Sequence, residues 1–184
     1  MRGKTTLQNT LDSYGLIARL FHWIIFLMVI GVIIGGNIVA DMPNGPDKAD
    51  MIGMHKSFGF AILVLVMLRL LWRLINPRPR DLGTSSFQNK LGHYMHILLY
   101  ILLLSQPITG ILMSQSFGHP VYPFDLFKVP TFLNENIRLG KILLEIHETL
   151  WVVLAISVGI HAAAALKHHF IEKNRTLMRM ILGR

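Results

Sequence analysis

Residues 143–166 read LLEIHETLWVVLAISVGIHAAAAL, an apolar run long enough to span a bilayer, with one histidine toward each end. The two histidines, His147 and His161, are fourteen positions apart. In an α-helix, fourteen residues rise about 21 Å and return to within about 40° of the starting direction. The stretch therefore predicts a membrane helix that presents two imidazoles on one side, at two depths.

Three more apolar stretches, at about 16–36, 52–75 and 92–116, are long enough to cross a membrane. The 184 residues are 52% hydrophobic and 15% charged, which is far more apolar than a typical soluble domain. Turn-forming proline, asparagine and glycine residues separate the stretches. We therefore expect an all-α transmembrane four-helix bundle in which residues 1–184 form a single integral membrane domain.

The chain has no cysteine, so metal or redox chemistry must depend on histidine, carboxylate or a bound organic cofactor. Thirteen of the eighteen lysines and arginines lie in the two tails and in the second loop with its adjoining helix end. Because positive residues stay in the cytoplasm, both termini are predicted to be cytoplasmic. The net charge of +8 is then mainly a topology signal, and no nucleic-acid partner is expected because no binding module is recognisable. The remaining five cations are Lys48, Lys56, Lys128, Arg138 and Lys141.

This topology assigns a depth to each histidine in the apolar stretches. His22 begins the first helix from the inside, and His55 opens the second helix from the outside. Matching depths pairs His22 with His161 near the inside and His55 with His147 near the outside. Two imidazoles can take both axial positions of a haem iron, which leaves no open coordination site and suits electron transfer.

Further polar residues lie at the predicted inner end. Arg69 is fourteen positions after His55 and is expected to face the propionates of an inner haem, although it can also be read as a topological cation. His93 and His96 share a helix face, where a propionate or structural role is favoured over an extra metal site. His168 is a candidate proton donor to a quinone, with an interfacial cationic tail as the alternative.

Small residues near the histidines are expected to make room for the cofactors. The spacing of Gly31 and Gly35 is also that of a simple helix-packing motif, and the two interpretations are compatible. The small residues expected to contribute are Gly31, Gly35, Gly53, Gly59, Gly159 and Ala162–Ala165.

Several short motifs carry a resemblance to a known family. They are FHW at 21–23, HKSFG at 55–59, RLLWR at 69–73, HET at 147–149 and HAAAALKHH at 161–169. With these motifs the chain resembles the bacterial cytochrome b561 proteins over nearly its whole length. The resemblance implies four membrane helices and two b haems, with iron ligands at His22, His55, His147 and His161.

The resemblance also implies an activity. The chain is similar to superoxide oxidases, in which superoxide gives electrons to the outer haem and ubiquinone accepts them, at the bacterial inner membrane. Lys56, Arg138 and Lys141 are the candidate catalytic cations that would attract superoxide, although nearby acidic residues partly offset their charge. The alternative is a non-catalytic cytochrome that links a periplasmic redox partner to the quinone pool. A histidine-lined metal transporter is disfavoured because no repeats or broken helices are evident.

Overall fold

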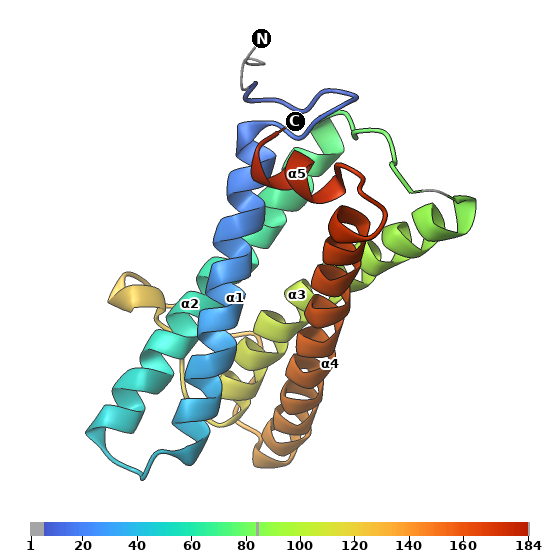
Figure 1. The fold of residues 1–184 in the computed structure, drawn as a ribbon. Coiled ribbons are helices and arrows are strands. Elements are labelled where there is room, and N and C mark those ends of the chain that lie inside the picture. Colours follow the sequence, from blue (N-terminus) through green and yellow to red (C-terminus); the bar gives the residue numbers. More distant parts are fainter. Residues whose placement is uncertain (1–5, 84, 184) are drawn as a thin grey trace.

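The computed structural model describes residues 6–83 and 85–183. Four long helices run up and down in alternation and form one bundle, with a short fifth helix across one end (Figure 1). The described residues contain no strand, and the predicted all-α fold with four membrane-length helices is confirmed. The elements are α1 (Leu16–Asp41), α2 (Pro46–Ile75), α3 (Ser86–Ser116), the 3-10 turn η1 (Pro123–Asp125), α4 (Ile137–Phe170) and α5 (Thr176–Ile181).

Each long helix extends past the apolar span predicted for it. α2 begins at Pro46, where proline is tolerated because the N–H of a first helical residue has no intrahelical partner. The Ser85 side chain caps α3, and that of Asn136 caps α4 by accepting from the Leu139 N–H at 3.0 Å. The expectation that His55 opens α2 is therefore wrong, because His55 is the tenth residue of that helix.

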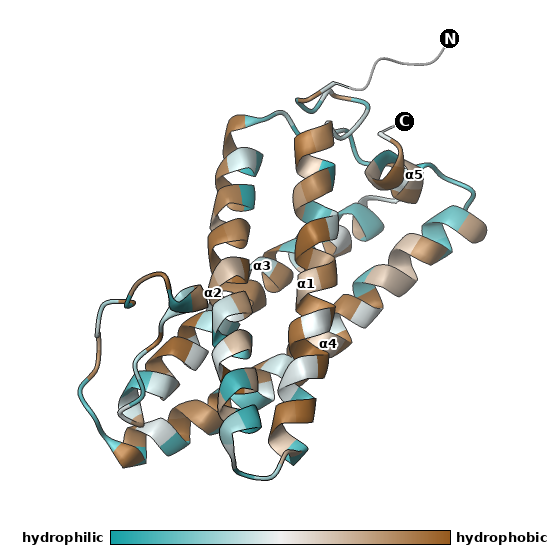
Figure 2. Cartoon of the chain, turned by 90° about the vertical axis from the view of Figure 1, so that its left-hand side faces the viewer, coloured by the Kyte–Doolittle hydropathy of each residue, from teal (hydrophilic) through white to brown (hydrophobic). Residues whose placement is uncertain are grey.

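Large apolar side chains cover the outside of the bundle. Leu27 is 66% exposed, Leu74 68% and Ile156 58%, and hydrophobic residues line the helices over most of their length while hydrophilic residues gather near the ends (Figure 2). Exposing such an apolar surface to water would cost free energy. Lipid tails are as apolar as these side chains and can cover them. Inside the bundle, one cluster of buried residues is formed by Ile25, Val29, Ile62, Val66, Leu102, Leu103 and Leu154.

Both ends of the described chain lie at the same end of the bundle, here called the terminal end (Figure 1). The Trp23 Nε1–H donates to the Met180 carbonyl at 3.1 Å, which holds α5 against α1. The backbone N–H of Arg80 donates to the Leu11 carbonyl at 2.8 Å, which ties the N-terminal segment to the loop after α2. Neither α5 nor η1 was expected from the apolar pattern. Three of the cations that predict a cytoplasmic location, Arg2, Lys4 and Arg184, lie outside the described residues.

The opposite end, here called the far end, holds the α1–α2 turn and the long connection from α3 to α4. This connection runs back along α2, where the Phe124 N–H donates to Ser57 Oγ at 2.9 Å. Two aromatic pairs also stabilise this position of the connection. They are Phe58–Phe124 and Phe60–Phe127, whose ring centroids are 5.4 and 5.6 Å apart. The connection therefore packs over part of the bundle instead of extending away from it.

Candidate functional site

Two imidazole pairs lie inside the bundle, one toward each end. At the far end, the ring centroids of His55 on α2 and His147 on α4 are 6.3 Å apart. At the terminal end, those of His22 on α1 and His161 on α4 are 6.2 Å apart. The structure thus brings together the same partners that depth matching pairs in the sequence.

The two separations suit a metal ion held between imidazoles. Metal–imidazole bonds are about 2.0–2.1 Å long for zinc. With similar bonds, two rings on opposite sides of one metal ion have centroids about 6 Å apart. Among the described residues, no group of three or more histidine or acidic side chains could hold a metal ion. A metal at either pair would therefore need its remaining ligands from a bound group, and a porphyrin supplies them.

The far-end pair borders an apolar cavity of about 560 Å³, here called the far-end cavity. Its size lies within the range of small-molecule and cofactor sites. A Cβ added at Gly36 would lie 3.0 Å from His55 Cε1, and one at Gly110 would lie 3.0 Å from His147 Cε1. These two glycines let the helices approach the rings closely, so any larger residue would displace an imidazole.

The glycines expected from the sequence to make this room are different ones. A Cβ on Gly31, Gly35, Gly53, Gly59 or Gly159 would meet no atom within 4 Å, so these glycines do not lie against the imidazoles, and their role in making room for a cofactor stays a prediction. Gly59 does line the far-end cavity, but Ala162–Ala164 face outward. Gly35 and Gly36 are adjacent, and the sequence does not indicate which of them faces His55.

Hydrogen bonds orient His147. Its Nδ1–H donates to the Gln106 carbonyl at 3.0 Å, and the Gln106 side-chain amide lies 3.2 Å from Nε2, to which it can donate. Nε2 therefore presents a lone pair, as a metal ligand must. His55 Nδ1 is buried without a hydrogen bond in the described chain, and the Val32 carbonyl is the backbone acceptor that lies near this imidazole.

Cations and aromatic rings surround the terminal-end pair. An Arg69 N–H donates to His22 Nδ1 at 3.2 Å, and the guanidinium carbons of Arg69 and Arg73 lie 5.7 and 5.6 Å from the Tyr100 ring centroid. His96 packs on His161 with ring centroids 5.4 Å apart. A cavity of about 920 Å³, here called the terminal-end cavity, adjoins these residues. Its basic lining residues include Arg69, Arg73, Arg78, Arg80, Lys90 and Arg179.

The remaining predicted site residues do not all lie in the two cavities. Lys56 lines the far-end cavity and is half-buried. Arg138 and Lys141 are exposed on the first turns of α4 and are absent from the lining of that cavity. His168 lines the terminal-end cavity, and its Nδ1 lies 2.6 Å from a carboxylate oxygen of Glu172, a partner that the sequence did not indicate.

Four membrane-length helices that enclose two imidazole pairs at two depths describe a membrane cytochrome. Comparison with known proteins gives the particular family. A family model described as prokaryotic cytochrome b561 matches residues 13–183, and the chain belongs to that family.

Curated relatives agree with this assignment. The chain is 35% identical to Cytochrome b561 homolog 2 of Escherichia coli (strain K12), over 94% of this chain and 93% of that one. It is 33% identical to the Probable superoxide oxidase CybB of Yersinia pestis, over 87% and 90% of the two chains. Cytochrome b561 homolog 1 of Escherichia coli (strain K12) is 30% identical, over 87% and 92%. The protein is thus a multi-pass membrane electron-transfer protein of a family that binds haem b.

Proposed function

We propose that this protein holds two b haems and passes electrons from superoxide at the far end to ubiquinone at the terminal end. The observation that carries the proposal is the pair of imidazole separations, 6.3 and 6.2 Å, at two depths of one bundle. A bound haem supplies one-electron transfer at each depth. Two superoxide anions lose one electron each and leave as O₂, while one quinone takes two electrons and two protons and becomes quinol.

In this proposal, His55 and His147 would hold one haem at the far end, and His22 and His161 would hold the other at the terminal end. At the far end, the Gln106 carbonyl holds His147 by its Nδ1–H, and the Gln106 side-chain amide, 3.2 Å from Nε2, would have to turn away for Nε2 to bind the iron. Gly36 and Gly110 leave room for the imidazoles of His55 and His147, which lie against them. Most of the cavity lining is apolar.

At the terminal end, Arg69 has to change partner when the haem binds. A guanidinium only donates hydrogen bonds, so its contact makes His22 Nδ1 an acceptor. A metal-bound imidazole usually donates a hydrogen bond from its other nitrogen. We therefore expect Arg69 to turn from His22 to a propionate carboxylate, which it can bind with two N–H groups. His96, packed on His161, is placed to limit ring rotation there.

The electron donor and acceptor are assigned from charge and position. Lys48 and Lys56 both line the far-end cavity, but the Lys48 Nζ donates to the Met42 carbonyl at 2.9 Å, so we assign Lys56 to attract superoxide. Arg138 and Lys141 would act from outside the cavity. His168 lines the basic terminal-end cavity, where it would donate protons to the quinone. The excess of positive residues at the terminal end supports a cytoplasmic location for it, with the protein in the bacterial inner membrane.

Purified protein provides the test. We expect two low-spin b haems per chain, reduction of both by an enzymatic superoxide source, and quinol formation when a short-chain ubiquinone is added. Lys56→Gln should slow the superoxide step several-fold at low salt and less at high salt, and Lys141→Gln, outside the cavity, should have a smaller effect. A haem count below two would contradict the ligand assignment. Haems reduced by a periplasmic protein but not by superoxide would favour the non-catalytic cytochrome instead.

A further inference from the structure

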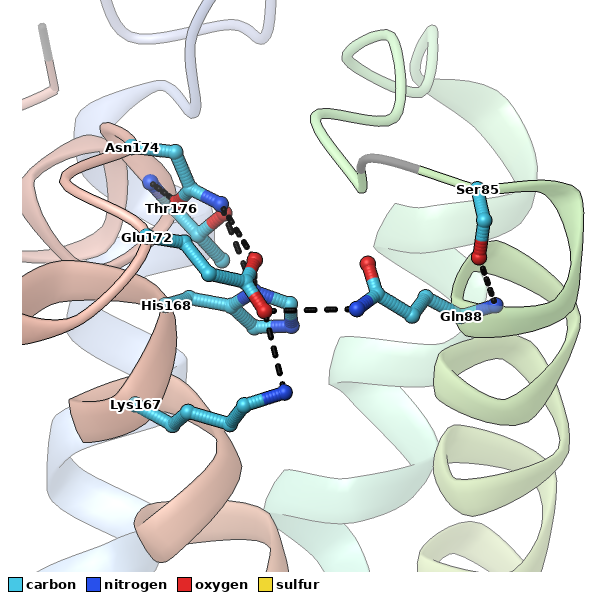
Figure 3. Close-up of polar contacts among 7 residues, drawn as sticks. All are labelled: Ser85, Gln88, Lys167, His168, Glu172, Asn174 and Thr176. Atoms are coloured by element: carbon cyan, nitrogen blue, oxygen red, sulfur yellow. Dashed lines mark hydrogen bonds and ion pairs between the residues drawn. The ribbon is translucent and has the colours of Figure 1, made fainter.

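A carboxylate closes the polar network at the C-terminal end of α4. Glu172 Oε2 accepts from the His168 Nδ1–H at 2.6 Å, and Oε1 accepts from Lys167 Nζ at 3.0 Å (Figure 3). Gln88, on the first turn of α3, donates from its side-chain amide to the same Oε1 at 3.2 Å. The Glu172 side chain is only 12% exposed, although it follows a membrane helix at the surface. Such a carboxylate is held in one position by several donors.

The contact fixes which nitrogen of His168 carries a hydrogen. An ionised carboxylate only accepts hydrogen bonds, so the 2.6 Å approach requires a proton on Nδ1. The side-chain nitrogen of Asn174 lies farther from the same atom, at 3.3 Å, and also donates to Glu172 Oε2. Nε2 is then the nitrogen of His168 that is available to a partner in the terminal-end cavity.

The surroundings of His168 are otherwise strongly basic. α2 and the loop after it contribute Arg69, Arg73, Arg78, Arg80 and Asp81 to the cavity lining. α3 contributes Lys90, His93, Tyr94, His96 and Tyr100, α5 contributes Arg179, and the N-terminal segment contributes Tyr14. Positive neighbours disfavour a protonated imidazole. Hydrogen bonds from His168 and Lys167 lower the pKa of the Glu172 carboxyl, so this carboxylate stays ionised beside His168.

We propose that Glu172 is a positioning residue for proton delivery: it holds His168 with Nδ1 protonated and supports the imidazolium, so that His168 Nε2–H donates to a reduced quinone in the terminal-end cavity. This inference rests on the proposed function. Each quinone that gains two electrons also gains two protons. His168 supplies one proton at a time from Nε2 and is reprotonated from water, while Glu172 keeps its charge throughout.

A purely structural role for Glu172 is the competing explanation, because the same carboxylate joins the start of α3 to the end of α4. The chain offers a matched control. Lys167→Gln removes one ion pair to Glu172 but leaves the contact between Glu172 and His168 intact. A structural latch should respond to both Lys167→Gln and Glu172→Gln. A positioning role should respond chiefly to Glu172→Gln.

The experiment mixes dithionite-reduced protein with a short-chain ubiquinone in a stopped-flow instrument between pH 6 and pH 9, so no superoxide is needed. For Glu172→Gln we expect haem reoxidation at pH 8 to slow about tenfold at saturating quinone, with the half-saturating quinone concentration unchanged. The rate should begin to fall with rising pH about one unit earlier than in the parent, because the imidazolium loses its counter-charge. Lys167→Gln should stay within about twofold of the parent.

Two further measurements separate positioning from structure. In a His168→Gln background, Glu172→Gln should cause no additional slowing, because its effect passes through His168. In ¹⁵N-histidine NMR spectra of the reduced protein, His168 should be protonated at Nδ1 in the parent and show mixed tautomers in Glu172→Gln.

A parent-like pH profile in Glu172→Gln, or equal slowing by Lys167→Gln, would overturn the inference while leaving quinone reduction established. Reduced parent protein that fails to react with quinone would overturn both this inference and the quinone part of the proposed function.

Discussion

The two ends of the bundle hold imidazole pairs of nearly equal spacing in very different surroundings. The far-end pair, at 6.3 Å, lies beside an apolar cavity with glycines against its rings. The terminal-end pair, at 6.2 Å, lies against Arg69 and beside a cavity lined by several arginines. The two ends therefore share the spacing of their imidazoles but differ in the charges around them.

This difference supports the proposed direction of electron transfer. A reduced centre carries one more negative charge than the oxidised centre, so nearby cations favour reduction. The far-end cavity offers fewer cations, Lys48 and Lys56, and the carboxylate of Glu148 in the same lining offsets part of their charge. We therefore expect electrons to move from the far-end site to the terminal-end site, across the core layer that contains Leu154, midway along α4 between His147 and His161.

The largest effect should come from removing one ligand of either pair. We expect His147→Leu and His161→Leu each to lower the haem content from two to one per chain and to abolish quinone reduction by superoxide, because each leaves one imidazole to hold an iron. A pyridine haemochrome assay and low-temperature spectra would show which component is lost in each variant. The exposed His119 in the far-end connection offers the control, since His119→Gln should keep both haems. Loss of the same component in both ligand variants would contradict the assignment of the pairs to two sites.

A smaller and local effect is expected at the far end from Gly110→Ala. The added Cβ would lie 3.0 Å from His147 Cε1, so the ring must shift from its position. We expect the far-end haem to be bound several-fold less completely and the terminal-end haem to be unchanged, as measured by haem content and reduced-minus-oxidised spectra. Gly31→Ala is the matched control, because a Cβ there meets no atom within 4 Å. Equal haem loss in the two variants would show that the glycines act through helix packing alone.

The electrostatic side of the comparison is tested with Arg69→Gln. Removing the guanidinium next to His22 should lower the reduction potential of the terminal-end haem by on the order of 59 mV, a tenfold change in a one-electron equilibrium. The far-end haem should change little, since Arg69 is absent from the lining of its cavity. Spectroelectrochemical titration would measure both potentials. Arg175→Gln, at an exposed position outside the lining of the terminal-end cavity, is the control, and an unchanged terminal-end potential in Arg69→Gln would remove the proposed cause of direction.

The sequence predicted the features that depend on a single helix. The helical repeat alone places His147 and His161 on one side of α4, and alternating topology then matches them with partners in other helices. Contacts between helices were harder to predict, because the rotation of α1 about its axis decides whether Gly35 or Gly36 meets His55. Glu172 gave no signal because it lies beyond the apolar run, and its approach to His168 depends on how the chain turns after α4.

The smallest expected effect concerns the stability of that turn at the terminal end. Hydrogen bonds from His168 and Lys167 lower the pKa of the Glu172 carboxyl, so the ionised form is favoured in the folded state. Its contribution is complete above the ordinary glutamate pKa of about 4.3 and is lost as the pH falls through the lower native value. The melting temperature of the parent should therefore exceed that of Glu172→Gln at pH 7, and the gap should narrow below pH 4. If the gap in melting temperature were the same at both pH values, the carboxylate charge would contribute nothing to the stability of this end of the bundle. This end would then differ from the far end only through its arginines.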